Sequence, residues 1–349
     1  MTDLKAYSKA NYFIQLSKDI EHCKPHDRIV VAAMTFDQND PLINALLKNL
    51  ALAAQRGIET ILAVDAYCFL IGNRNIPGPL EFSRKINHVS SPQFQAKSRF
   101  LNNLRAQGVK VVITNPPPRR LSNPFAGRSH AKYAVINDTA YLGGCNLDSS
   151  TDYDLMVSCT DKRLADWLYN YALALIRNGG RNKLYRHDQV LDLGTHMKLL
   201  LDVGIPGQSE ILQHAYYVID HAKQNLMLTC MIFPDGSVMQ HLIKAHERGV
   251  HIRLLCNHPA KLRFPSNLYH RFQMRHHQNL VPDSFYDHQL PRSGEFLHLK
   301  VLASENAAIV GSHNFVDIGV KLGTIEMALY TEESNSASVI RQAVEDMTL

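Results

Sequence analysis

The stretch HAKYAVINDTAYLGGCN, from His130 to Asn146, places a histidine and a lysine two positions apart in an otherwise hydrophobic strand. Nearly the same pattern returns as HLKVLASENAAIVGSHN, from His298 to Asn314. Residues two apart in a strand point to the same side, so each His-Lys pair is predicted to share one face. A lysine on such a face is costly to bury without a partner, and a bound anion would offset that cost. The repeat at equal spacing predicts two halves of one anion site.

Composition indicates a globular chain and narrows the class of ligand. The 349 residues are 45% hydrophobic and 20% charged, which argues against extensive disorder and allows two domains of ordinary size. The formal net charge of +5 suits an anionic substrate or surface. The chain lacks the block of basic residues typical of a dedicated nucleic-acid binder. Its 18 histidines would add positive charge at mildly acid pH.

Cysteine usage and hydropathy bear on the compartment. The six cysteines are scattered and never form a C-x-x-C pair, so neither a zinc site nor a disulfide framework is indicated. We therefore predict a reduced, cytoplasmic setting. Residues 1–20 lack the apolar core of a signal peptide, and no stretch approaches the roughly 20 apolar residues of a membrane span. Any contact with a membrane is predicted to be peripheral, at its inner face.

The chain repeats one order of elements. A helix is predicted from about Asp3 to Glu21, followed by a strand over residues 28–36. A later helix ends in AAQRG and leads into a strand, and the second half has a close match in AHERG and the strand after it, with Gly57 and Gly249 at the helix ends. Self-similarity of this kind indicates an internal duplication.

Alternating strands and helices, with strands rich in Val, Ile and Leu, predict the α/β class. We expect two duplicated halves, each a mainly parallel sheet flanked by helices. The polar, glycine-containing stretch from Ile176 to Gln189 is typical of a seam between them. The first half is placed at residues 1–182 and the second at residues 183–349. One pseudo-twofold site at their junction is expected, and it requires no second chain.

The two segments resemble the paired HKD motifs of the phospholipase D superfamily, H-x-K-x4-D followed by G-G/S-x-N. The positions that fit are His130, Lys132, Gly143, Gly144 and Asn146 in the first copy, and His298, Lys300, Gly311, Ser312 and Asn314 in the second. Asn137 and Glu305 stand at the position of the motif aspartate. In the family this aspartate is chiefly structural, so the replacements concern local packing more than chemistry. The resemblance covers most of the chain and implies the duplicated fold.

The resemblance implies a mechanism that agrees with the chemistry of these side chains. A neutral imidazole attacks phosphorus to form a phosphohistidine, a protonated imidazole supplies the leaving oxygen's proton, and water or an alcohol resolves the intermediate. By similarity His130 is the nucleophile and His298 the general acid, with the reverse order left open. Positive charge and preorganised donors on the phosphoryl oxygens are expected from Lys132, Lys300, Asn146 and Asn314. The scheme requires no metal and no cofactor.

Each histidine also needs an acid on its other ring nitrogen. The expected position is the strand after each asparagine loop, where Asp154 lies in YDLMVSC and Glu326 in GTIEMALY. A carboxylate in a short apolar strand is costly without a partner, which favours this role for both residues. Asp152 competes with Asp154 for it.

The substrate has to be inferred from the loops, because the superfamily includes phospholipases, phosphatidyl transferases such as cardiolipin and phosphatidylserine synthases, and nucleases. Residues 66–77, 115–128 and 259–295 mix apolar, aromatic and basic side chains. This mixture suits acyl chains below an anionic headgroup. We therefore predict a phospholipid substrate at a membrane surface, as in cardiolipin-synthase-like members. The positions expected to bind it are Gly144, Ser312, Arg128 and Tyr67.

Three alternatives are left open by the sequence. The same loops would suit base stacking, which would make the protein a metal-independent nuclease or phosphodiesterase of single-stranded nucleic acid. The loops would otherwise pack onto the domain without a ligand. The third alternative is a binding protein that has lost activity. Superfamily members that lose activity usually lose a motif residue, and here the His-Lys-Asn core is intact in both copies.

Overall fold

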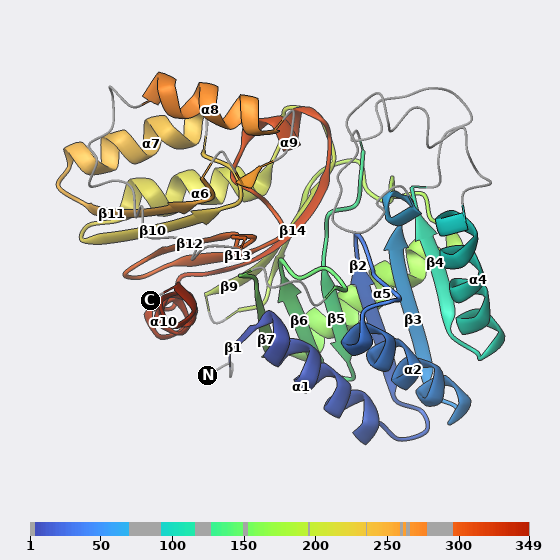
Figure 1. Cartoon of the computed structure of the whole chain (residues 1–349). Helices are drawn as coiled ribbons and strands as arrows, with labels where there is room; N and C mark the ends of the chain where they lie inside the picture. The colour runs from blue at the N-terminus through green and yellow to red at the C-terminus, as the bar shows by residue number, and fades with distance from the viewer. Residues whose placement is uncertain are drawn as a thin grey trace.

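The computed structural model describes residues 4–69, 92–115, 127–148, 153–194, 196–234, 236–258, 261–262, 266–277 and 296–348. Within these ranges the strands form two seven-stranded sheets (Figure 1). The first sheet has the order β1-β7-β6-β5-β2-β3-β4. Its strands are β1 (Lys5–Ser8), β2 (Arg28–Ala33), β3 (Glu59–Asp65), β4 (Lys110–Thr114), β5 (Tyr133–Ile136), β6 (Thr139–Gly143) and β7 (Leu155–Thr160).

The second sheet has the order β11-β10-β12-β13-β14-β9-β8. Its strands are β8 (Gln189–Asp192), β9 (Met197–Val203), β10 (Asn225–Cys230), β11 (His251–Cys256), β12 (Val301–Ser304), β13 (Ala308–Gly311) and β14 (Ile325–Thr331). Six neighbouring strands of the first sheet, β3-β2-β5-β6-β7-β1, correspond in order to β11-β10-β12-β13-β14-β9 of the second. The duplication predicted from the sequence is therefore present in the fold.

Most neighbouring strands are antiparallel, so the prediction of mainly parallel sheets is wrong. Among the named strands of the described ranges, the parallel neighbours are β2–β3, β3–β4 and β10–β11. The remaining strands include β5–β6 and β12–β13, which are joined by tight turns, and such short links connect antiparallel neighbours. The strands have the continuous apolar composition of parallel sheets because both faces of each sheet are covered.

The helices lie on both faces of the sheets. They are α1 (Lys9–His22), α2 (Pro41–Gln55), α4 (Pro92–Ala106), α5 (Lys162–Arg177), α6 (Glu210–His221), α7 (Gly236–Glu247), α8 (Ser266–His277), α9 (Asp317–Lys321) and α10 (Ser334–Thr348), with a short 3₁₀ helix η1 (Ala66–Phe69). The first helix begins later than the sequence predicted. Residues 5–8 instead form β1, because their backbone pairs with β7.

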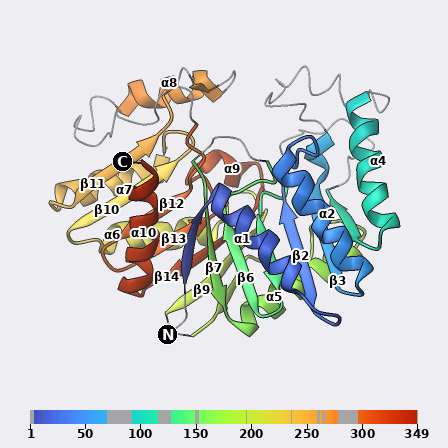
Figure 2. The same cartoon turned by 60° about the horizontal axis from the view of Figure 1, so that its bottom comes forward.

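One face of each sheet packs into a core that the two halves share. Tyr133 of β5, Leu199 of β9 and Val301 of β12 belong to this buried cluster. Leu168 of α5 and Ile340 of α10 also lie in it. The outer faces are covered separately, by α1, α2 and α4 in the first half and by α6 and α7 in the second (Figure 1). Figure 2 shows α10 beside β1, so the last helix lies against the first strand.

Candidate active site

The two His-x-Lys segments lie immediately before β5 and β12, at the carboxyl ends of β2 and β10. Tyr133 pairs with Ala32 near the end of β2, and Val301 pairs with Thr229 near the end of β10. The sequence predicted each His-Lys pair within a strand, whereas the structure places the pairs just before β5 and β12. The predicted alternation still holds, because Ala131 and Tyr133 belong to the shared core on the opposite face from the lysine between them.

Backbone bridges join each histidine segment to the other half. The amide of His130 donates to the carbonyl of Ile325 at 2.8 Å, and the amide of His298 donates to the carbonyl of Tyr153 at 2.8 Å. Both contacts belong to short parallel bridges between the halves. Glu326 follows Ile325, and Asp154 follows Tyr153. The bridges therefore bring each of these predicted acids to the histidine of the other half.

The histidine–carboxylate pairs cross between the halves. Nδ1 of His130 lies 3.0 Å from Oε2 of Glu326, and Nδ1 of His298 lies 2.6 Å from Oδ2 of Asp154. The sequence predicted each acid on the strand after an asparagine loop. In the structure each acid contacts the histidine of the opposite copy. A carboxylate at Nδ1 holds the proton there and leaves Nε2 of a neutral ring with its lone pair.

Both carboxyl groups are buried and remain ionised. The side chain of Asp154 is 0% exposed and that of Glu326 is 6% exposed. Burial acts to raise the pKa of each group, but the partner histidine and the nearby lysine outweigh it. The pKa of Glu326 falls to about 2, and the pKa of Asp154 is also lowered. Each imidazole therefore has a charged acceptor behind it.

The motif lysines are cations buried beside each other. Lys132 and Lys300 are each 1% exposed. Nζ of Lys132 donates to the backbone oxygen of His130 at 2.6 Å, and Nζ of Lys300 donates to that of His298. Burial and the charge of Lys300 lower the pKa of Lys132 to about 7. Two cations that burial and mutual repulsion disfavour are stabilised by an anion, so the pair suits a phosphoryl group.

The motif asparagines lie on the loops after β6 and β13. Asn146 and Asn314 are both half-buried. Within the described part of the chain, the buried Oδ1 atom of each side chain lacks a hydrogen-bond partner. Leaving a buried amide without partners costs about 1–3 kcal/mol. A hydroxyl of a substrate would satisfy the oxygen, and after a flip of the amide the nitrogen would donate to a phosphoryl oxygen. Both asparagines are thus placed to contact a ligand.

Comparison with known proteins agrees with this geometry. A family model described as "Cardiolipin synthase, PLD-like domain" matches residues 16–176 and 217–348, and so includes both halves. The chain belongs to the phospholipase D superfamily. A search of curated protein sequences found no match.

Solved structures share the superfamily fold at low sequence identity. Phosphatidylserine synthase from Haemophilus influenzae Rd KW20 has a TM-score of 0.70 and 14% identity, over 99% of this chain and 85% of that chain. Polyphosphate kinase from Porphyromonas gingivalis has a TM-score of 0.56 and 15% identity, over 99% of this chain and 50% of that chain. At such identities the likeness establishes the fold.

The two departures from the superfamily motif have structural roles. Asn137 lies in the turn between β5 and β6 with φ of 52°, a conformation that asparagine tolerates. Its Oδ1 accepts a hydrogen bond from the amide of Arg28 at 3.2 Å. The carboxylate of Glu305 accepts from the amides of Lys223 and Asn225, at 2.8 and 3.2 Å. In both copies a side-chain oxygen at this position accepts hydrogen bonds from the backbone at the start of the neighbouring strand.

Gly144 and Ser312, which the sequence predicted to bind substrate, lie beside the two carboxylates. A Cβ on Gly144 would lie 2.1 Å from Oδ1 of Asp154, so glycine makes room for that acid. The hydroxyl of Ser312 is buried, donates to Oε2 of Glu326 and accepts from the amide of Met327 at 3.0 Å. Both positions therefore help to place the acids, and their role in binding substrate stays a prediction.

Arg128 and Tyr67, also predicted to bind substrate, are buried around Asp65. Arg128 is 6% exposed and Tyr67 is 4% exposed. Nη1 of Arg128 lies 3.2 Å from Oδ1 of Asp65, which also accepts from the amide of Tyr67 at 2.7 Å. The other oxygen of Asp65 accepts from the amide of Ser129 at 2.8 Å. This cluster fixes the segment that leads into His130.

Asp65 and Asn257 are two positioning residues that the sequence reasoning missed. Asn257 donates to the carbonyl of Leu297 at 2.7 Å and accepts from its amide at 2.9 Å, immediately before His298. Asp65 is the last residue of β3, and Asn257 directly follows the equivalent strand β11. They also lie the same number of residues after Gly57 and Gly249, so the alignment of the repeat contained the signal.

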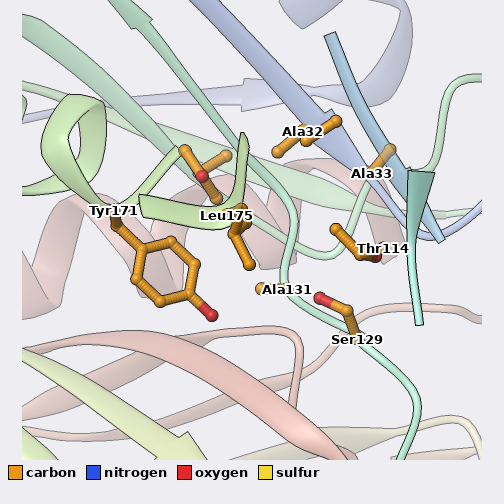
Figure 3. Close-up of a pocket in the computed structure, with 9 residues that line it drawn as sticks. Ala32, Ala33, Thr114, Ser129, Ala131, Tyr171 and Leu175 are labelled. Carbon is orange, nitrogen blue, oxygen red and sulfur yellow. The ribbon is translucent and has the colours of Figure 1, made fainter. Parts of the chain in front are cut away.

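A pocket lies on the face of the His130 segment that points away from Lys132. Figure 3 shows Ser129 and Ala131 at this pocket, together with Ala32, Ala33, Thr114, Tyr171 and Leu175. Its lining residues also include Tyr133, whose buried hydroxyl has no hydrogen-bond partner in the described part of the chain. The pocket is a feature of the core behind the candidate site.

Most of the segments expected to recognise the substrate lie outside the described residues. This holds for residues 70–91, 116–126 and 278–295, and for Asp152, the predicted competitor of Asp154. Where the structure describes the chain, none of the helices has the length and apolar character needed to cross a bilayer.

Proposed function

We propose that this protein is a phosphodiester-cleaving or phosphatidyl-transferring enzyme that acts on phospholipids through a phosphohistidine intermediate. The observation that carries the proposal is the pair of histidines, each held at Nδ1 by an acid of the opposite half, beside the buried Lys132 and Lys300. This arrangement offers two imidazoles and two cations to one phosphate group.

The first step exchanges one bond to phosphorus for another. The lone pair on Nε2 of a neutral histidine forms an N–P bond, and the bond from phosphorus to the leaving oxygen breaks. The second histidine, protonated at Nε2, gives its proton to that oxygen. In the second step water or an alcohol attacks phosphorus, the N–P bond breaks, and the proton of the nucleophile returns to the second histidine. Hydrolysis and transfer differ only in this last acceptor.

Charge on the non-bridging oxygens is stabilised by groups already in place. Lys132 and Lys300 are fixed by their hydrogen bonds to backbone carbonyls, so little reorganisation is needed when a phosphate arrives. Asn146 and Asn314 offer amide groups from the two loops. In this scheme the chain's own side chains supply the positive charge that a metal would otherwise supply, and no cofactor takes part.

The description of the matching family, cardiolipin synthase, favours a phospholipid substrate over nucleic acid. The helix α8 adds a feature suited to a membrane surface. Leu268 and Phe272, one turn apart, are 60% and 67% exposed. Arg271 and Arg275 are exposed on the same helix. Apolar side chains beside basic ones are typical of helices that lie in the interface of an anionic membrane.

The same helix is hydrogen-bonded to the chain that follows β10. His270 is 0% exposed, and its Nδ1 accepts from the amide of Phe233 at 2.8 Å, beyond the carboxyl end of β10. His298 and Lys300 lie at the same end of the sheet, because Val301 pairs with Thr229 near the end of β10. α8 lies at the top of the second half in Figures 1 and 2, and α9 lies at the same end. We infer that α8 rests on the membrane while the site beneath it receives a headgroup.

Vesicle binding tests the role of α8. Replacing Leu268 and Phe272 together by serine is expected to weaken binding to phosphatidylglycerol vesicles by about tenfold, since each loses an apolar side chain from the interface. Co-sedimentation measures this loss. Val190→Ser, at an exposed valine of β8, is the matched control and should bind like the original chain. Equal binding by the α8 variant would remove this helix from the proposal.

The decisive experiment offers the purified protein two substrates with EDTA present. Phosphatidylglycerol vesicles and single-stranded DNA are incubated separately, and products are resolved by mass spectrometry. Cardiolipin or phosphatidic acid that is absent with His130→Ala would support the lipid reaction and distinguish transfer from hydrolysis. Cleaved DNA with unchanged lipid would move the protein to the nuclease alternative. Absence of a trapped phosphohistidine with either substrate would contradict the covalent mechanism.

A further inference from the structure

Two cysteines are direct neighbours at the ends of two parallel strands. Cys230 is the last residue of β10 and Cys256 is the last residue of β11, and the register of these strands pairs the two. Both side chains pack against the outer core of the second half, so they lie on the same face of the sheet. Among the strands that the structure describes, no other two cysteines are register partners. The backbone therefore places these two sulfur atoms together.

The spacing of neighbouring strands suits a bond between the two sulfur atoms. Paired strands lie about 4.8 Å apart, and a disulfide joins residues whose Cα atoms are about 4.4–6.8 Å apart. The Cβ atoms of a disulfide are closer, at about 3.8 Å, so the two strand ends must move together slightly when the bond forms. A bond formed against such resistance is more easily reduced than a structural disulfide. The pair therefore suits a reversible disulfide.

The two residues differ in their exposure to solvent. Both side chains are thiols in the structure. Cys256 is half-buried on β11, which is the outermost described strand of its sheet, whereas Cys230 is 0% exposed. A small oxidant in solution therefore reaches Cys256 first, with Cys230 beside it. Burial raises the pKa of the Cys256 thiol to about 12, so the reactive thiolate is scarce at neutral pH and the oxidation is slow.

The pair adjoins the side chain that holds the second histidine segment. Asn257 follows Cys256 directly and is 1% exposed. Its amide nitrogen donates to the carbonyl of Met231 at 2.9 Å, and Met231 follows Cys230. The same side chain donates to the carbonyl of Leu297 at 2.7 Å and accepts from its amide at 2.9 Å. A movement of the ends of β10 and β11 is therefore transmitted through Asn257 to the segment that carries the second motif histidine.

The first half has the same pairing of strand ends without sulfur. β2 corresponds to β10 and β3 to β11. Ala33 and Val64 are register partners at the positions equivalent to the two cysteines. Alanine and valine are thus accommodated at these positions of the fold, and they provide matched replacements for the thiols.

We propose that Cys230 and Cys256 form a redox-sensitive pair, which a hydroperoxide oxidises to a disulfide that displaces His298 and lowers the activity of the enzyme. Formation of the disulfide goes beyond the proposed function, whereas the loss of activity rests on it. Asn257 carries the effect from the strand ends to the site.

The oxidation balances with one hydroperoxide as the electron acceptor. The sulfur of Cys256 loses its proton and attacks a peroxide oxygen, the O–O bond breaks, and a sulfenic acid forms while water or an alcohol leaves with the proton. The sulfur of Cys230 then attacks the sulfenic sulfur. The S–S bond forms, the S–O bond breaks, and the hydroxyl leaves as water with the proton of Cys230. Two electrons pass from the two thiols to the peroxide, and a dithiol reductant returns both thiols.

Peptide mapping tests whether the disulfide forms, without any substrate. The full chain is treated with hydrogen peroxide, remaining thiols are blocked with N-ethylmaleimide, and trypsin digestion is carried out without reduction. Trypsin separates the two cysteines, because Lys244, Arg248 and Arg253 lie between them. A single linked pair of peptides containing Cys230 and Cys256 is expected. The same treatment in urea should link the six cysteines in several combinations. Other pairs in the folded chain, or overoxidised cysteines without a link, would overturn the proposal.

Imidazole NMR tests whether the disulfide reaches the site. The chain is labelled with ¹⁵N-histidine, and the signal of His298 is identified by its loss in His298→Gln. Peroxide should move this signal in the original chain, and dithiothreitol should return it. Cys230→Ala and Cys256→Val carry the residues of the first half and should show no movement. An unchanged His298 signal in a chain that contains the disulfide would refute the link to the site.

Activity measurements complete the test. Peroxide is expected to reduce product formation from phosphatidylglycerol vesicles by about tenfold, because a small displacement of a reacting group is costly. Dithiothreitol should restore it. Cys256→Val has the same methionines and should keep its activity under the same treatment, and equal inhibition of this variant would contradict the role of the pair. If the untreated chain turns over no phospholipid, the proposed function fails, while the mapping and NMR results still decide the disulfide.

Discussion

The two halves of this protein are nearly identical in the groups that they bring to the candidate site and different in the residues that support those groups. Both supply a histidine, a buried lysine and an asparagine whose buried oxygen has no hydrogen-bond partner among the residues that the structure describes. Behind the acids, the first half has Gly144, whereas the second has Ser312, whose hydroxyl donates to Glu326. The groups at the candidate site are therefore repeated, whereas the residues that support the acids are not.

The largest effect is expected at the histidines, where the halves should be equally essential. His130→Ala and His298→Ala should each reduce turnover by about 10³-fold or more, because one removes the acid and the other the nucleophile. Product formation from phosphatidylglycerol vesicles measures the loss, and circular dichroism checks the fold. Substantial activity in either variant would contradict a site shared by the halves.

The crossed pairing of acids comes next in size. Asp154→Ala and Glu326→Ala should each lower kcat by about 10²-fold, since a histidine loses its orienting carboxylate. A double-mutant cycle sharpens the comparison. His298 with Asp154 should be coupled by about 1–2 kcal/mol, whereas His298 with Glu326 should be nearly additive. Stronger coupling within one half than across the halves would refute the crossed arrangement.

Exchange of the small residues behind the acids should have unequal effects. Gly144→Ala places a Cβ where Oδ1 of Asp154 lies, so the acid must move and kcat is expected to fall by about 20- to 100-fold. Ser312→Ala removes one hydrogen bond to Glu326 and should cost about fivefold. Steady-state kinetics at constant pH measures both. A larger loss for Ser312→Ala than for Gly144→Ala would contradict this order.

The smallest effect concerns the charge of Lys132. Because burial lowers its pKa to about 7, this lysine loses its proton as pH rises above neutrality, and affinity for an anion should fall. Sulfate, whose charge is constant in this range, should bind about five- to tenfold more weakly at pH 9 than at pH 6. Calorimetric titration measures the difference. Lys132→Met should bind weakly with a flatter pH dependence, and an unchanged slope would exclude Lys132 as its source.

Sequence alone predicted the chemistry of the site better than its architecture. The His-Lys-Asn positions and both acids were accessible because a charged group in an apolar strand requires a partner, and the requirement appeared twice. Asp65 and Asn257 were also accessible from the repeat. The pairing of acids with histidines was not, because it depends on backbone bridges between segments that are far apart in the chain, such as His130 with Ile325.

Two other outcomes depend on tertiary contacts that a local pattern does not contain. Arginine is a common phosphate-binding residue, yet Arg128 forms a buried ion pair with Asp65. Strands covered on both faces have the composition of parallel sheets although most of them are antiparallel.

The bridges between the halves also determine when the site can first exist during synthesis. The first half carries His130 and Asp154, and its sheet is complete at β7. The partners of these residues, Glu326 and His298, are translated much later, and Glu326 lies on β14. A nascent chain that has folded its first sheet therefore holds neither histidine–carboxylate pair. The His298–Asp154 pair needs the segment before β12, and the His130–Glu326 pair needs β14, so phosphodiesters near the ribosome meet no complete site until β14 is in place.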